Sequence, residues 1–324
     1  MLKKLSLANT DLNVSQLCLG TNMFGTAQLL DKAGEILETF LAGGGNFIDT
    51  AHSYGDWIPG IPNAASERTL GELLKGKPRA GYVLATKGCE FDYRKGDYAP
   101  RVTPDHLAAD LAGSLELLGV GFIDLYWLHR DDQSRPVKDI VDALIGHQQA
   151  GRIRHFGCSN WSVDRILEAQ QYAASLGHGG FVACQPMWGL AEPNRAAMMT
   201  YAPGGYYEDG YQVLHQAGMT MVPYSGQSRG IFSKLATSTT KEAISPDVAA
   251  LYYHDANLRK VDALKAIAIR LGASVNDIVL AYLTSQPLAT VPIIGCSSLA
   301  QLRESIAACA IRLDAEELRQ LREA

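Results

Sequence analysis

Eight short apolar segments recur along this chain, and most are followed by a longer segment with the periodicity of a helix. Several of the short segments are almost continuously apolar, which is typical of parallel strands covered on both faces. Strand–helix units that repeat in this way favour a parallel α/β fold, and eight of them favour a closed (β/α)8 barrel, the TIM barrel. The expected strands are Leu17–Gly20, Asn46–Thr50, Tyr82–Lys87, Phe122–His129, His155–Ser159, Phe181–Gln185, Thr220–Ser225 and Thr290–Gly295.

The clearest helical segment is Thr103–Leu118. Thr103 suits the position that caps a helix, and Pro104 suits the first helical position. Leucines spaced three or four residues apart then form one apolar face, and Gly119 suits the end of the helix. The same pattern predicts helices at Asp31–Ala42, Ser66–Lys75, Val137–Ala150, Val163–Leu176, Asn257–Leu271, Val275–Ser285, Leu299–Ala308 and Asp314–Arg319.

The main competitor of the barrel is an open, doubly wound sheet. Such sheets often carry a G-x-G-x-x-G motif after the first strand, and this sequence has none there. The segments Leu2–Leu7 and Leu12–Leu17 predict an N-terminal β-hairpin before the barrel. The irregular stretches Glu192–Gly210 and Ser228–Asp255 predict long loops at the C-terminal face. Since barrels of this length are often one domain, we expect a single barrel domain over residues 1–324.

Composition argues against several classes of function. The 324 residues include 29 Lys and Arg and 34 Asp and Glu, so the net charge of −5 gives no electrostatic footprint for nucleic acid. No window approaches the roughly 18 consecutive apolar residues of a membrane span, and we expect neither a signal peptide nor a membrane contact. The six cysteines form no C-x-x-C pair, which is typical of buried thiols in a reducing compartment. We therefore expect a cytoplasmic protein, and the sequence leaves its oligomeric state open.

Ionisable side chains lie at the ends of three successive predicted strands. Asp49 ends the second strand and Tyr54 follows five residues later, while Lys87 ends the third strand. His129 ends the fourth. The carboxyl ends of neighbouring parallel strands meet at one rim of a barrel, where active sites lie. An ammonium at Lys87 would lower the pKa of a Tyr54 phenol, ordinarily near 10, and so make it a proton donor for a carbonyl oxygen. Asp49 would keep Lys87 charged, and His129 would orient the carbonyl.

These four residues carry no reductant, so reduction of a carbonyl needs a separate hydride source, for which a nicotinamide cofactor is the natural choice. Each residue taken singly has an ordinary structural explanation, because aspartates cap helices, tyrosines pack in cores, and lysines or histidines are solvated at rims. Their occurrence at three successive strand ends favours a catalytic site.

Four motifs resemble those of the aldo-keto reductase superfamily. They are N-F-I-D-T-A-H-S-Y-G at Asn46–Gly55, A-T-K at Ala85–Lys87, D-L-Y-W-L-H at Asp124–His129 and G-C-S-N-W at Gly157–Trp161. The resemblance covers nearly the whole chain and implies an NAD(P)H-dependent carbonyl reductase or alcohol dehydrogenase. It also implies that Tyr54 is the general acid of a catalytic tetrad whose other members are Asp49, Lys87 and His129.

The same resemblance implies a groove for the cofactor. Ser159, Asn160 and Gln185 match positions that hold the nicotinamide carboxamide, and Tyr224 matches an aromatic residue that stacks on the ring. The pyrophosphate and adenosine would lie along Ser225, Gln227, Arg229, Gly230, Gly295, Ser297, Gln301 and Glu304. The pair Gly226-Gln227 departs from the usual Pro-Leu, and Gln301 stands where an arginine is common. The resemblance implies NADP(H) as the cofactor, with NAD(H) as the alternative because Gln301 offers no charge to a 2′-phosphate.

Side chains beyond the strand ends would wall a pocket for a small-molecule carbonyl or alcohol substrate. The candidates for substrate contact are Met23, Trp57, His129 and Trp188, for which ordinary packing at the rim is the competing explanation. The loop Tyr201–Tyr211 is rich in Tyr and Gly. Tyrosines beside polar groups suit a sugar-like ligand, which presents both CH faces and hydroxyls.

Two other functions compete with a carbonyl reductase. A catalytically silent, nicotinamide-binding regulatory subunit is the main alternative, against which the intact set of four ionisable residues argues. A metal-dependent barrel hydrolase is the other, suggested by His52 near Asp49 and by His129 near Asp131. The sequence has no H-E-x-x-H motif and no Cys/His cluster with ligand spacing, so we expect no metal site.

Overall fold

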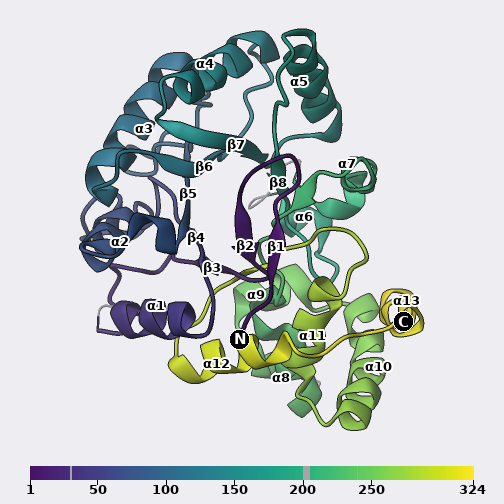
Figure 1. Cartoon of the computed structure of the whole chain (residues 1–324). Helices are drawn as coiled ribbons and strands as arrows, with labels where there is room; N and C mark the ends of the chain where they lie inside the picture. Colours follow the sequence, from purple (N-terminus) through teal and green to yellow (C-terminus); the bar gives the residue numbers. More distant parts are fainter. Residues whose placement is uncertain (30, 200–204, 239) are drawn as a thin grey trace.

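The computed structural model describes residues 1–29, 31–199, 205–238 and 240–324. Eight parallel strands form one sheet in the order β10-β3-β4-β5-β6-β7-β8-β9. They are β3 (Cys18–Gly20), β4 (Phe47–Asp49), β5 (Val83–Gly88), β6 (Ile123–Leu128), β7 (Ile153–Ser159), β8 (Ala183–Gln185), β9 (Thr220–Met221) and β10 (Ile293–Ile294). The two ends of the sheet meet, because the backbone N–H of Met221 donates to Ala289 O at 3.0 Å and that of Ile293 donates to Pro223 O at 2.9 Å. The predicted (β/α)8 barrel is confirmed (Figure 1).

Helices surround the barrel and alternate with its strands (Figure 1). They are α1 (Ala33–Ala42), α2 (Ala65–Leu74), α3 (Pro104–Leu118), α4 (Val137–Gln149), α5 (Val163–Ser175), α6 (Arg195–Met198), α7 (Gln212–Gln216), α8 (Ile231–Thr237), α9 (Pro246–Tyr252), α10 (Asp255–Leu271), α11 (Val275–Thr284), α12 (Leu299–Ala308) and α13 (Ala315–Glu323). Every helix that the sequence predicted has a counterpart with similar bounds. The short helices α6, α8 and α9 lie in stretches that the sequence predicted as loops.

Helix α3 begins and ends as its sequence predicted. The Thr103 hydroxyl accepts a bond from the backbone N–H of His106 at 3.2 Å, which satisfies one of the free donors of the first turn. Gly119 ends the helix with a left-handed φ of 65°, a conformation that glycine adopts without strain. Leu107 and Leu111 are buried against the barrel.

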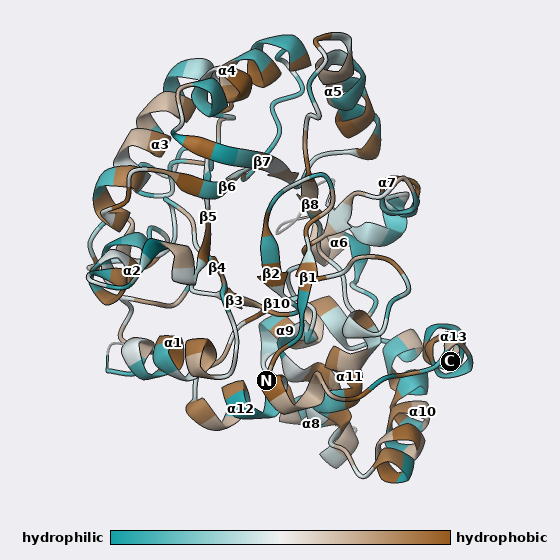
Figure 2. Cartoon of the chain, in the orientation of Figure 1, coloured by the Kyte–Doolittle hydropathy of each residue, from teal (hydrophilic) through white to brown (hydrophobic). Residues whose placement is uncertain are grey.

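Two helices show how burial differs around the barrel. Figure 2 shows mixed hydrophobic and hydrophilic residues on α4, whereas α11 is more uniformly hydrophobic. Helix α4 buries one stripe that includes Val137, Ile140 and Leu144. In α11 the consecutive residues Ile278–Leu283 are all buried, because this helix packs between α8, α10 and α12.

The predicted N-terminal hairpin is present as β1 (Lys4–Ser6) and β2 (Asn13–Ser15). It lies across one opening of the barrel (Figure 1). Leu7 and Leu12 are buried with the inward-facing Phe47 in one cluster, and the backbone N–H of Ala8 donates to the hydroxyl of Thr220, the first residue of β9, at 3.3 Å. The hairpin therefore closes the amino end of the barrel and leaves the carboxyl end for a site.

The last two strands of the barrel are much shorter than the sequence predicted. The segments Thr220–Ser225 and Thr290–Gly295 contribute only β9 and β10 to the ladder. Pro223 and Pro292 interrupt these segments, and proline has no N–H to donate to a neighbouring strand.

Within the described ranges, no helix taken alone has both the length and the apolar character needed to cross a membrane. The pair α10 and α11 meets that test only when joined, and it is bent by 93°.

Candidate active site

The strand order places three of the predicted catalytic residues on neighbouring strands. Lys87 lies at the end of β5, between β4, which ends at Asp49, and β6. The Lys87 ammonium donates to Asp49 Oδ2 at 2.5 Å, to the Tyr54 hydroxyl at 2.8 Å and to the backbone O of Thr50 at 2.8 Å. These bonds use all three donors of the ammonium. The side chains of Lys87 and Asp49 are 0% and 1% exposed, so the phenol is held by a charged pair from which water is excluded.

Burial shifts the pKa values of Tyr54 and Lys87. Removal from water disfavours the phenolate and raises the pKa of Tyr54 above its usual 10, although the Lys87 charge acts in the opposite direction. Burial alone would lower the pKa of Lys87, but the charges of Asp49 and Tyr54 reverse that effect and leave it raised. The sequence led us to expect a lowered pKa for Tyr54. The charge of Lys87 does act in that direction, but burial outweighs it, so the net pKa of Tyr54 is raised.

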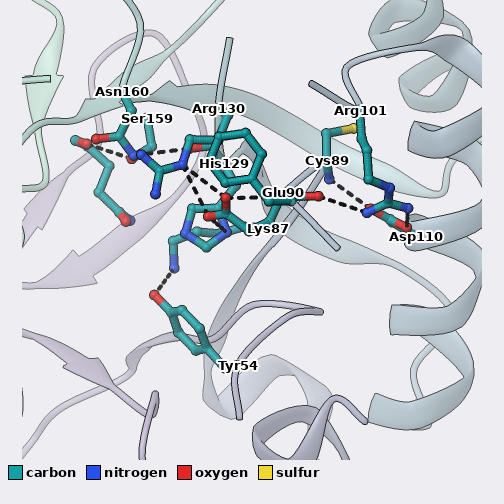
Figure 3. A network of polar contacts seen from close by, with 12 residues as sticks. Tyr54, Lys87, Cys89, Glu90, Arg101, Asp110, His129, Arg130, Ser159 and Asn160 are labelled. Carbon is teal, nitrogen blue, oxygen red and sulfur yellow. Dashed lines mark hydrogen bonds and ion pairs between the residues drawn. The ribbon is translucent and has the colours of Figure 1, made fainter. Parts of the chain in front are cut away.

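His129 follows directly after β6 and faces Tyr54, with the ring centroids 5.8 Å apart in an edge-to-face arrangement. Its Nδ1 lies 3.3 Å from Oε2 of Glu90, which also accepts a bond from Arg130 Nε to its Oε1 at 3.0 Å (Figure 3). Burial, with the charges of Lys87 and Arg130, holds the pKa of His129 well below its usual 6.5. The imidazole is therefore neutral at physiological pH.

A cavity of about 1200 Å3 opens beside these groups, and Asp49, Tyr54 and His129 line it. Its size exceeds the roughly 300–1,000 Å3 of ordinary small-molecule pockets, as a dinucleotide requires. All the residues predicted to contact a cofactor line this cavity, namely Ser159, Asn160, Gln185, Tyr224, Ser225, Gln227, Arg229, Gly230, Gly295, Ser297, Gln301 and Glu304.

The carboxamide-binding residues form a connected polar cluster. Asn160 donates to the Ser159 hydroxyl at 3.1 Å and to the backbone O of His129 at 3.0 Å, and it accepts a bond from the Tyr224 hydroxyl at 2.8 Å. Gln185 donates to Asp49 Oδ1 at 3.1 Å. Its Oε1 has no donor among the residues that the structure describes and is left to accept a bond from a ligand. This donor and acceptor set fits a carboxamide.

The cavity also has cationic side chains in its lining, among them Arg229 and Lys234. Arg229 donates to Asp247 Oδ2 at 2.8 Å. Gln301 accepts bonds through Oε1 from both the backbone N–H and the hydroxyl of Ser297, at 2.8 and 3.0 Å. The backbone at Ser225 and Arg229 is left-handed, with φ of 59° and 53°. Such strain in residues other than glycine is typical of ligand-binding loops.

Comparison with known proteins identifies the family. The family model described as "Aldo/keto reductase family" matches residues 16–324. The chain belongs to this family. It is 31% identical to "Uncharacterized oxidoreductase YrpG" of Bacillus subtilis (strain 168), over 97% of this chain and 93% of that protein.

Other relatives of this aldo/keto reductase carry different descriptions. It is 27% identical to "Probable voltage-gated potassium channel subunit beta" of Oryza sativa subsp. japonica, over 94% of this chain and 90% of that protein. A crystal structure of the thermostable aldo-keto reductase Tm1743 with the inhibitor epalrestat superposes with a TM-score of 0.71 at 23% identity, over 99% of each chain. This last likeness concerns the fold.

The residues predicted to contact a substrate lie in different surroundings. The Trp57 ring is 41% exposed and lies edge-to-face with Tyr54, with centroids 6.0 Å apart. Trp188 is buried and stacks on Tyr207, 3.6 Å between centroids, so its ring offers no surface to a substrate in this structure. Met23 is partly buried against the core and does not line the cavity.

The loop thought to suit a sugar falls partly outside the described residues, which omit positions 201–204. In its described part, Tyr206 and Tyr207 are buried and do not line the cavity. The expectation drawn from this loop therefore has no support from its described residues.

Sequence reasoning missed Glu90 and Arg130. Arg130 lines the cavity beside His129, and Glu90 is buried behind both. The sequence offered one usable signal, a charged pair within three residues of the Lys87 and His129 strand ends. Over the described ranges, no group of three or more His, Cys, Asp or Glu side chains is placed to hold a metal ion.

Proposed function

We propose that this aldo/keto reductase reduces an aldehyde or ketone to an alcohol with NADPH and catalyses the reverse reaction with NADP+. The observation that carries the proposal is the 2.8 Å bond between the Lys87 ammonium and the Tyr54 hydroxyl beside a dinucleotide-sized cavity. We also propose that the whole site belongs to a single barrel domain over residues 1–324.

A bound reduced nicotinamide would supply the hydride. Tyr54 is protonated at neutral pH, since the pKa of a phenol is ordinarily near 10 and burial raises it further, so it is an acid that can protonate the carbonyl oxygen. The phenolate left behind is stabilised by the Lys87 ammonium, and Asp49 keeps that ammonium charged. A positioned acid of this kind typically contributes about 10²- to 10⁴-fold in rate.

Several residues along the cavity would hold the cofactor. Asn160 and the free Oε1 of Gln185 would bind the carboxamide, and Tyr224 would pack on the nicotinamide ring. The preference for NADP(H) is supported by Arg229 and Lys234, which line the cavity. These cations would supply the charge that Gln301 lacks.

We propose that the substrate is a polar, sugar-like carbonyl compound. The cavity presents Asn22, Gln28 and Arg130 as well as the catalytic residues, so hydroxyls on a substrate find hydrogen-bond partners. The half-exposed Trp57 ring beside Tyr54 offers an apolar face for the CH groups of such a compound.

The second candidate function is a silent, nicotinamide-binding regulatory subunit. The similarity to a protein described as a channel subunit favours it. The geometry of Tyr54 and Lys87 argues against it, because a silent subunit has no need of a phenol held by a buried ammonium.

Single-turnover oxidation of bound NADPH by a reactive aldehyde separates the two functions. The wild-type protein should oxidise NADPH. Tyr54→Phe should slow this step by about 10²-fold or more while leaving the dissociation constant for NADPH within about twofold. Lys87 keeps Asp49 and the Thr50 carbonyl as partners in this variant, so the fold should persist. Wild-type turnover in Tyr54→Phe would show that Tyr54 is not the proton donor, and a wild-type protein that binds NADPH but never oxidises it would favour the regulatory subunit.

A further inference from the structure

A second cavity, of about 360 Å3, shares no lining residue with the cavity beside the catalytic residues. Its walls come from the loop after β8, from the short helical turn η2 (Tyr207–Asp209), and from α6, α10, α11 and α13. Figure 1 shows these four helices on the same side of the barrel. The volume lies in the range of small-molecule pockets, and the chemistry proposed above gives the second cavity no role.

Buried residues fix the walls of the second cavity. Asn257 is fully buried and holds the loop after β8, because it accepts a bond from the backbone N–H of Glu192 at 2.9 Å and donates to the backbone O of Glu192 at 2.8 Å. Tyr206, Tyr282 and Leu190 line the cavity and are 4%, 3% and 3% exposed. The floor of the second cavity is therefore part of the packed core.

Most charges around the second cavity are already paired. Its charged residues are Glu192, Arg195, Glu208, Lys260 and Arg322. Lys260 pairs with Glu192 at 2.5 Å, and Arg195 pairs with Asp209 at 2.9 Å. Among the residues that the structure describes, Arg322 and Glu208 form no ion pair, either with each other or with a third group. The second cavity thus presents one unpaired cation and one unpaired carboxylate.

The carboxylate of Glu208 has lost hydration without gaining a counter-ion. Partial removal from water raises the pKa of Glu208, although the charge of Arg322 acts in the opposite direction. Its Oε2 accepts a bond from Gln212 at 2.6 Å. A cation bound next to Glu208 would therefore replace hydration that the carboxylate has lost.

Lys260 has donors that the protein leaves unused. Its side chain is 3% exposed, and among the described residues its ammonium donates only to Glu192. An ammonium has three N–H donors, so two of them have no acceptor within the described part of the chain. Buried donors without acceptors cost free energy, and a ligand in the second cavity can supply an acceptor.

We propose that the second cavity binds a small aliphatic α-amino acid in its zwitterionic form. The carboxylate of this ligand would accept bonds from Arg322 and Lys260, and its ammonium would donate to Glu208. A guanidinium suits a carboxylate because it can donate two parallel N–H bonds. Phosphate or a dicarboxylate fits less well, since it would bring a second negative charge beside Glu208. The buried Leu190 and Pro193 offer apolar contact to the aliphatic side chain. Binding of this kind is independent of the proposed reductase function.

Calorimetric titration of the wild-type protein with L-leucine and with glycine tests the class of ligand. Leucine should bind with a dissociation constant below about 10 mM. It should bind more tightly than glycine, because its side chain reaches the apolar wall. Binding by neither amino acid, or glycine binding as tightly as leucine, would overturn the proposal.

Two analogues of leucine test whether both charges are needed. Isocaproate lacks only the ammonium, and isoamylamine lacks only the carboxylate. Each should bind at least about tenfold more weakly than leucine, because one charge-assisted contact is lost. An analogue that keeps the affinity of leucine would show that the second cavity does not recognise a zwitterion, and would refute the proposal.

Two substitutions locate the bound amino acid. Arg322→Gln and Glu208→Gln should each weaken leucine binding at least about tenfold. Neither residue lines the active-site cavity, so these losses would place leucine in the second cavity. Both residues are exposed, so the fold should persist. Unchanged leucine binding in either variant would contradict the proposed site.

Arg319→Gln provides the control for loss of an arginine from the same helix. Arg319 lies on α13, pairs with Glu323 at 2.5 Å and does not line the second cavity. Its variant should bind leucine as the wild type does, and a loss equal to that of Arg322→Gln would overturn the assignment. These measurements need no turnover, so failure of the reductase function would leave their outcome unchanged.

Discussion

Replacing Lys87 with methionine tests whether the site depends on a fully buried ion pair. The ammonium is removed while the length of the side chain is nearly kept, so a cavity contributes little to the result. Asp49 then remains 1% exposed with Gln185 as its hydrogen-bond partner, at 3.1 Å. A buried carboxylate without a counter-ion typically costs about 3–5 kcal/mol. We expect Lys87→Met to lower the free energy of unfolding by that amount at pH 7.

A second substitution should restore the stability without restoring the chemistry. Adding Asp49→Asn removes the stranded charge, and neutral replacements of a whole buried pair are often close to neutral in stability. The double variant should therefore recover most of the loss. It should remain inactive, because no ammonium is left to stabilise the Tyr54 phenolate.

Lys260→Met is the matched control for the loss of a buried lysine. The Lys260 side chain is 3% exposed, but its partner Glu192 is 51% exposed, so the charge left behind stays in contact with water. Lys260→Met should lower the free energy of unfolding by about 1 kcal/mol or less. Urea unfolding followed by circular dichroism measures all three variants against the wild type.

The pH dependence of Lys87→Met gives a further check. Burial raises the folded-state pKa of Asp49 above 3.8 even with Lys87 present, and loss of the lysine removes the charge that opposes this rise. A carboxyl with a raised folded-state pKa destabilises the fold increasingly as pH rises from its unfolded-state pKa, about 3.9, to its folded-state pKa, and the penalty is absent only below the unfolded-state pKa. The loss of unfolding free energy in Lys87→Met should thus become smaller as the pH falls. If Lys87→Met costs no more than Lys260→Met and Asp49→Asn recovers nothing, the stranded-charge reasoning is refuted.

Two further outcomes concern pH and the cofactor. The pKa of Tyr54 is raised above 10, and that of His129 is held well below 6.5. The value of kcat/KM for reduction should therefore be flat through neutral pH, whereas kcat/KM for alcohol oxidation should keep rising up to about pH 10. An inflection near pH 6.5 would contradict a neutral His129. Arg229 and Lys234 line the cavity, so NADPH should bind more tightly than NADH in a competition titration. Lys234→Met should reduce this difference in affinity while leaving the dissociation constant for NADH within about twofold. Tighter binding of NADH by the wild type would reverse the assignment of the cofactor.

Most of the barrel could be predicted because its signals are local. The segment Thr103–Leu118 contains its own capping residue, an acidic residue in the first turn that complements the helix dipole, and one apolar face. The structure accordingly has α3 at Pro104–Leu118. The ends of the last two strands could not be predicted, because each apolar run is longer than the part that pairs with its neighbours. Pro223 and Pro292 lie in these runs and have no N–H to donate to a neighbouring strand. The short helices within the long loops carry too few residues to show a period.

The part of the site that depends on backbone path was not predictable from the sequence. Asp49, Lys87 and His129 could be expected near one another because parallel strand ends meet at one rim. Glu90 was missed because it lies in an irregular segment, directly after Cys89, where the chain turns through a left-handed conformation. The direction in which the pKa of Tyr54 shifts was also not predictable from the sequence. The sequence places the charge of Lys87 near Tyr54, but only the structure gives the burial that raises the pKa. Sequence position therefore indicates which charges meet, whereas burial determines in which direction the pKa of each group shifts.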